Sequence, residues 1–110
     1  MTKITFFKSK GKCIGFECFG HADYADEGED IVCAAISVLT INTMNSIEAF
    51  TEDKIDVKTL QEAGFMSMHF ENPDDLSKEA LVLMQSLELG LNSIASEYGK
   101  QFVTVLTQEV

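Results

Sequence analysis

The chain has 110 residues and a formal net charge of -10, from 18 acidic and 8 basic side chains. This length fits one domain over residues 1–110, and 45% apolar residues are enough for a core, which excludes a disordered chain. A net anion is repelled by phosphate backbones and anionic lipid surfaces. We therefore expect no direct nucleic-acid partner, no membrane partner, and a basic macromolecular partner if there is one.

The amino-terminal sequence and the cysteines predict a cytoplasmic protein. MTKITFFKSK contains only a short apolar run interleaved with Thr and Lys, which is not typical of a signal peptide. The longest mostly apolar stretch, residues 31–41, is shorter than the roughly 20 residues of a membrane span. The odd cysteine count, from Cys13, Cys18 and Cys33, argues against a disulfide framework.

Hydrophobic periodicity predicts the element order β-β-α-β-β-α-β. Strands are expected over residues 2–8, 13–19, 54–58, 64–70 and 101–107, with a tight turn at 9–12, and helices over 30–50 and 76–98. The predicted fold class is α/β (α+β), a small mixed β-sheet packed on one face against two helices. The first helix is apolar on most sides and is expected to be buried. Asp74 or Asp75 is expected to cap the second helix, and Gly99 to end it.

The chemistry is concentrated in residues 20–37, GHADYADEGEDIVCAAIS. His21 lies in a predicted loop, and Cys33 lies near a helix start. If Asp30 caps that helix, a thiolate at Cys33 faces unpaired backbone N–H groups and the positive end of the helix dipole. His21 could then take the thiol proton, which would make Cys33 an activated nucleophile. Cys33 as a small buried side chain and His21 as a solvated one remain open alternatives.

Four further residues of this segment have two interpretations each. Asp30 is either a plain helix cap or a carboxylate that orients His21. Ser37, one turn after Cys33, contacts the thiol or the loop, or bonds back to its own helix. Gly20 and Gly28 are hinges of the loop, or simply satisfy turn geometry.

We expect no metal and no cofactor. Zinc binding would use Cys13, Cys18, His21 and Cys33, but C-x4-C-x2-H-x11-C is not a common zinc spacing. On one strand, Cys13 and Cys18 should also point to opposite faces. The acidic loop lacks the ligand rhythm of a calcium site. His69 lies between Met68 and Phe70 on a predicted strand, so its side chain is expected to face the opposite side of the sheet, in a structural or surface role.

The segment closely resembles the signature of the ribosomal-processing cysteine protease family, Prp. The matching residues are Gly20, His21, Ala22, Tyr24, Gly28, Asp30, Ile31, Val32, Cys33, Ala34, Ala35 and Ser37. The resemblance implies a cysteine endopeptidase with Cys33 as nucleophile and His21 as general base, and it gives importance to Asp30 and Ser37. It also implies a homodimer that removes a short N-terminal extension from a large-subunit ribosomal protein.

The alternative is a non-catalytic acidic module that binds basic ribosomal proteins. In either case the negative charge would attract the partner, since five acidic side chains lie within residues 21–30 and ribosomal proteins are strongly basic. Long-range attraction by this segment would help to capture a basic partner, and salt would weaken it.

Overall fold

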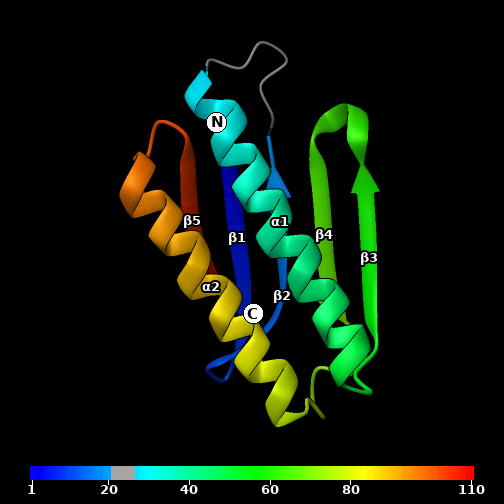
Figure 1. Cartoon of the computed structure of the whole chain (residues 1–110). Helices are drawn as coiled ribbons and strands as arrows, with labels where there is room; N and C mark the ends of the chain where they lie inside the picture. Colours follow the sequence, from blue (N-terminus) through cyan, green and yellow to red (C-terminus); the bar gives the residue numbers. More distant parts are fainter. Residues whose placement is uncertain (21–26) are drawn as a thin grey trace.

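The computed structural model describes residues 1–20 and 27–110, and of residues 27–30 it describes the backbone alone. Within these ranges the chain follows the predicted order (Figure 1). The elements are β1 (Thr2–Ser9), β2 (Lys12–Phe19), α1 (Glu27–Phe50), β3 (Ile55–Leu60), the short 3-10 helix η1 (Gln61–Ala63), β4 (Phe65–Phe70), α2 (Lys78–Tyr98) and β5 (Val103–Glu109).

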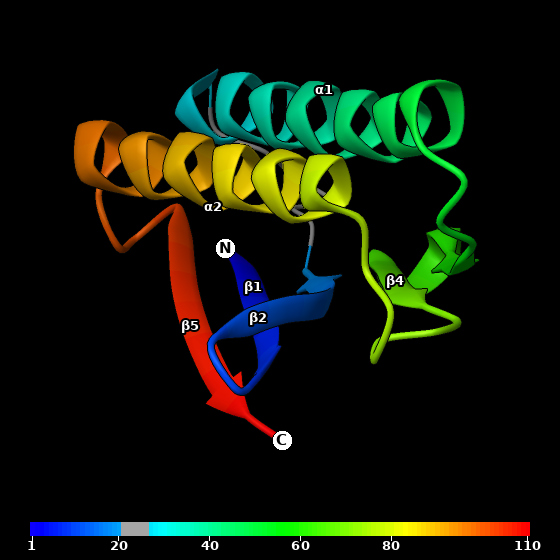
Figure 2. The ribbon, with the colours of Figure 1, turned by 90° about the horizontal axis from the view of Figure 1, so that it is seen from below.

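The strands form one mixed sheet in the order β3-β4-β2-β1-β5. The β1–β5 pair is parallel, and the other three neighbouring pairs are antiparallel. Both helices lie side by side on the same face of this sheet (Figure 2). The predicted fold class and the one-sided packing are therefore confirmed.

The core lies between that face and the helices. Alternate residues of the central strands point into it, as period-two burial requires. Its fully buried members include Ile4 and Phe6 of β1, Phe16 of β2 and Met68 of β4, against Ile47 of α1 and Met84, Leu87 and Leu91 of α2. The outer face of the sheet carries His69, whose ring lies 5.4 Å from the ring of Phe7, so His69 points away from the core as predicted.

A β-bulge corrects the expected orientation of one cysteine. Phe7 pairs with Gly15, whereas the next residue, Lys8, pairs with Cys13, so Ile14 is an extra residue in β2. The bulge restores the inward direction of the strand, and both Cys13 and Cys18 are buried in the core. The expectation that these two thiols point to opposite faces was wrong.

The helix starts also differ from expectation. α1 begins at Glu27, three residues before the predicted start, so Asp30 lies inside the helix and the cap interpretation was wrong. Acidic residues are favourable near the positive end of a helix, and this favours the longer helix over Glu27 to Asp30.

The N-cap of α2 is Ser77, whose hydroxyl accepts from the backbone N–H of Ala80 at 3.0 Å, instead of Asp74 or Asp75. Gly99 does end α2, with φ of 96°.

α1 is not the buried central helix that its composition predicted. Its side chains Val38 and Phe50 are 66% and 74% exposed, because only one side of the helix packs on the sheet and α2. The stretch Ile31–Phe50 is long and apolar enough to cross a membrane by length and composition, so the expectation that no segment reaches that length was also wrong. Core helices of soluble proteins pass the same test, and this one buries Val32 and Ile47 in the core.

Candidate active site

Cys33 lies at the side of a groove of about 330 Å³. The groove runs between α1, the first residue of β1, the end of β2 and the connection from β3 to β4. It is lined by Thr2, Cys18, Gly20, Cys33, Ile36, Ser37, Thr40, Ile41, Thr59, Gln61, Gly64, Phe65 and Met66. Cys33 is only partly buried. Its thiol is therefore beside a space that a peptide segment can enter.

Thr2 connects Cys33 to the end of β2. Its hydroxyl lies 4.0 Å from the sulfur of Cys33 and 3.4 Å from the carbonyl oxygen of Gly20, to which it donates. The backbone N–H of Gly20 donates in turn to the carbonyl of Gly64 at 3.0 Å. These contacts hold the last described residue before His21 against both β1 and the β3–β4 connection.

Gly20 is required as glycine at this point. Its φ is +111°, which L side chains rarely adopt, and a Cβ there would collide with the carbonyl oxygen of Met1. Of the two interpretations of Gly20, these contacts support the turn geometry. Gly28 lies in the first turn of α1, so the prediction that it belongs to the loop was wrong.

The other predicted residues separate into two groups. Ser37 is exposed and lines the groove with Cys33, one helical turn away. A contact of its hydroxyl with the thiol or the loop stays a prediction. His21 lies outside the described residues, as does the side chain of Asp30. The pairing of Cys33 with His21, and a contact of Asp30 with His21, therefore stay predictions.

The position of Cys33 in α1 changes one part of the predicted chemistry. With Glu27 as the first residue, Cys33 is the seventh residue of the helix. Only about the first four N–H groups of a helix lack a partner within it. The backbone N–H of Cys33 is therefore not one of the unpaired groups, and Cys33 does not lie at the helix start where a thiolate was expected to face them.

The three cysteines are all free, and they differ in their surroundings. Burial raises the pKa of Cys18 to about 12. Burial is also the main cause that raises the pKa of Cys13 to about 11. Both thiols are therefore neutral at physiological pH, although Cys18 borders the same groove as Cys33.

Among the described residues no group of three His, Cys, Asp or Glu side chains is arranged to hold a metal ion.

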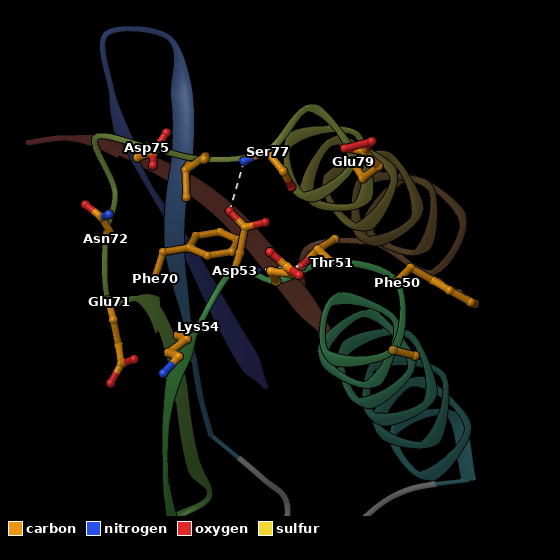
Figure 3. A pocket seen from close by; sticks show the side chains of 13 residues that line it. Phe50, Thr51, Asp53, Lys54, Phe70, Glu71, Asn72, Asp75, Ser77 and Glu79 are labelled. Atoms are coloured by element: carbon orange, nitrogen blue, oxygen red, sulfur yellow. Dashed lines mark hydrogen bonds between the residues drawn. The ribbon is translucent and has the colours of Figure 1, made fainter.

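A wider cleft of about 940 Å³ lies at the other end of α1, between that end and the start of α2 (Figure 3). Its lining includes Glu52, Asp53, Glu71, Asp75 and Glu79, with Lys54. In this cleft a carboxylate oxygen of Asp53 accepts from the backbone N–H of Ser77 at 2.9 Å. The lining contains neither Cys nor His, so the groove beside Cys33 is the candidate site for nucleophilic chemistry.

A family model described as Cysteine protease Prp matches residues 1–103 of the chain. The chain belongs to this family. Ribosomal processing cysteine protease Prp of Staphylococcus aureus is 30% identical over 91 residues, which cover 83% of this chain and 84% of that protein. The protein of the same name from Bacillus subtilis is 29% identical over 105 residues, covering 89% and 90%.

Solved structures show the same fold. A Streptococcus mutans protein of known crystal structure superposes with a TM-score of 0.88 at 28% identity, covering 100% of this chain and 96% of that one. The S. aureus ribosomal processing protease in complex with a substrate peptide gives a TM-score of 0.88 at 23% identity, covering 98% and 100%.

The family membership means that this protein is a cysteine protease. The alternative of a non-catalytic module is therefore set aside. Sequence reasoning missed Thr2 and the β3–β4 connection as parts of the groove. Neither carries a local signal, because they reach Cys33 only through the pairing of distant strands.

Proposed function

We propose that this protease removes a short N-terminal extension from a basic protein of the large ribosomal subunit, with Cys33 as nucleophile and His21 as general base. The observation that carries the proposal is the partly exposed thiol of Cys33 at the groove, in a chain of the ribosomal processing protease family. The two other thiols are neutral and buried, which leaves Cys33 as the cysteine suited to attack.

The proposed reaction is acyl transfer. The Cys33 thiolate attacks the scissile carbonyl, and His21 protonates the amine that leaves as the peptide bond breaks. His21 then removes a proton from water, which hydrolyses the thioester and frees the thiol. Asp30 and Ser37 support this pair, Ser37 from its place beside Cys33 in the groove.

The test is incubation of the purified protein with the extended ribosomal protein, read as a loss of mass from the substrate. We expect cleavage by the native chain and none by Cys33→Ala. Cys18→Ala is the matched control, since it removes the other thiol that borders the groove and should still cleave. Cleavage by Cys33→Ala would overturn the assignment of the nucleophile, and an intact substrate with the native chain would overturn the proposed substrate.

Charge supports a basic substrate. The net charge of -10 and the five acidic side chains within residues 21–30 attract a basic protein from a distance. We expect kcat/KM to fall steadily as NaCl is raised from 50 to about 500 mM, because salt shortens the range of the attraction. A value that does not depend on salt would leave the charge with no role in capture.

We also propose that the protein acts as a cytoplasmic homodimer. One side of α1 exposes Ile31, Ala34, Val38 and Ile41, at the alternating spacings of three and four that pairs of helices use. Residues 31–47 include no charged side chain, so two copies with net charge -10 each can meet there with the least repulsion. Three free cysteines fit a reducing cytoplasm.

The oligomeric state can be measured by sedimentation. We expect a dimer for the native chain and a monomer for Val38→Glu, because a charge in the centre of this stripe is costly to bury. Leu89→Glu is the control, since Leu89 is similarly exposed at 71% but lies on α2. A monomeric native chain, or a Val38→Glu variant that stays dimeric, would contradict the proposed interface. Cell fractionation tests the compartment.

A further inference from the structure

Thr2 places a buried hydroxyl between Cys33 of α1 and Gly20 at the end of β2, which both line the active-site groove. The residue is 5% exposed and begins β1, where its backbone N–H donates to the carbonyl of Phe102. Further along the same face of β1, Ile4 and Phe6 are apolar and fully buried. A valine has nearly the same shape as threonine and would continue this apolar row. A hydroxyl at this position therefore needs polar partners.

Both partners of the Thr2 hydroxyl among the described residues belong to the groove. One is the sulfur of Cys33 at 4.0 Å, and the other is the carbonyl oxygen of Gly20 at 3.4 Å. A hydroxyl has one proton to donate, so it can serve only one of these acceptors at a time. A neutral thiol is a weak acceptor, whereas a thiolate is a charged and stronger one.

We propose that Thr2 is a positioning residue of the active site, whose hydroxyl donates to the Gly20 carbonyl when Cys33 is a thiol and to the Cys33 sulfur when it is a thiolate. This switch stabilises the nucleophilic form of Cys33. It also releases the Gly20 carbonyl, directly before His21, when the thiolate forms. The inference rests on the proposed role of Cys33 as nucleophile.

Four other residues that line the groove carry a hydroxyl or amide group, namely Ser37, Thr40, Thr59 and Gln61. Of these neutral groups and that of Thr2, the described contacts place the Thr2 hydroxyl against the Cys33 sulfur. Cys18 is the other titratable residue in the described lining of the groove, and it stays neutral to high pH. Glu62 follows Gln61 in η1 but is exposed and is not part of the lining. His21, which follows Gly20 along the chain, is the proposed base. A neutral donor at Thr2 would therefore assist the proposed base.

Two variants isolate the hydroxyl. Thr2→Val keeps the shape and removes the donor, and Thr2→Ser keeps the donor. The measurement is the rate at which iodoacetamide modifies Cys33, followed as a function of pH and assigned by peptide mass. For Thr2→Val we expect the pH of half-maximal rate to rise by about one unit. We expect Thr2→Ser to keep the native profile, and kcat/KM for the substrate to fall about tenfold in Thr2→Val alone.

The controls separate this role from a structural one. Thr107→Val makes the same exchange in β5, where Thr107 is exposed, and should alter neither the alkylation profile nor kcat/KM. If Thr2→Val does not fold, Thr2→Ala removes the same hydroxyl and replaces it in the experiment. A native alkylation profile in a folded variant without the hydroxyl would overturn the proposal. An equal shift in Thr2→Ser would do the same.

The result is also distinguishable from a failure of the proposed function. If Cys33→Ala still cleaves the substrate, the nucleophile is wrongly assigned, and stabilisation of a Cys33 thiolate by Thr2 has no part in the reaction. If Cys33→Ala is inactive while Thr2→Val behaves as the native chain, only the role of Thr2 is wrong.

Discussion

The backbone N–H of Gly20 donates to the carbonyl of Gly64, 44 positions further along the chain, at 3.0 Å. This bond ties the end of β2 to the connection between η1 and β4. It fixes the point from which the chain continues to His21. The same two glycines line the groove beside Cys33.

We expect Gly20→Ala to destabilise the fold by about 3 kcal/mol, measured by urea unfolding, because it combines a left-handed φ with a collision against the Met1 carbonyl. Gly11→Ala is the matched control. Gly11 also has a positive φ, of 79°, but a Cβ there meets nothing within 4 Å, so we expect a loss of about 1 kcal/mol. Equal losses in the two variants would contradict the argument from the collision.

The cysteines should react at very different rates in the folded protein. At pH 8 we expect iodoacetamide to add once, at Cys33, because the thiols of Cys13 and Cys18 are buried and their pKa values are raised to about 11 and about 12. Intact mass measures the number of adducts, and unfolding in guanidinium should increase it to three. Modification of Cys18 as fast as Cys33 would show that the groove exposes both thiols.

Stability should decrease in alkali. Burial raises the pKa of Cys18 from 9.0 to about 12, so above pH 9 the unfolded chain loses this proton while the folded chain keeps it. The stabilisation is complete below pH 9 and is lost as the pH rises toward 12, with a slope of about 1.4 kcal/mol per pH unit for one such group. We expect Cys18→Ala to lose stability less steeply between pH 9 and 11, in urea unfolding at each pH. Parallel curves would contradict the raised pKa.

Asp53 should contribute to stability in the opposite pH direction. Burial acts to raise its pKa, but hydrogen bonds from Ser77 and Thr51 outweigh burial, and the pKa is lowered from 3.8. The contribution is therefore present above the usual carboxyl range and is lost as the pH falls through the lowered value. In thermal unfolding from pH 6 to pH 2, Asp53→Asn should flatten the acid side of the profile. Asp74→Asn, at an exposed carboxylate nearby, should leave it unchanged.

Local periodicity predicted the type and order of the elements correctly, since each depends on spacings within one segment. It failed where two alternatives have the same local pattern. The composition of α1 does not reveal which of its apolar sides meets a partner, and Val38 is exposed while Ile36 is buried. Regular alternation along β2 does not reveal the bulge at Ile14, because the bulge is a property of pairing with β1.

By itself the sequence determined the element order, the family signature and the position of Cys33 within it. These are local patterns of residue type and spacing, and they do not depend on how the chain folds. The tertiary structure decided which groups surround Cys33: the hydroxyl of Thr2, the carbonyl of Gly20 and the β3–β4 connection. Thr2 is 31 positions from Cys33. They meet because the sheet places the start of β1 beneath α1, a contact that depends on packing between distant segments and has no local signal.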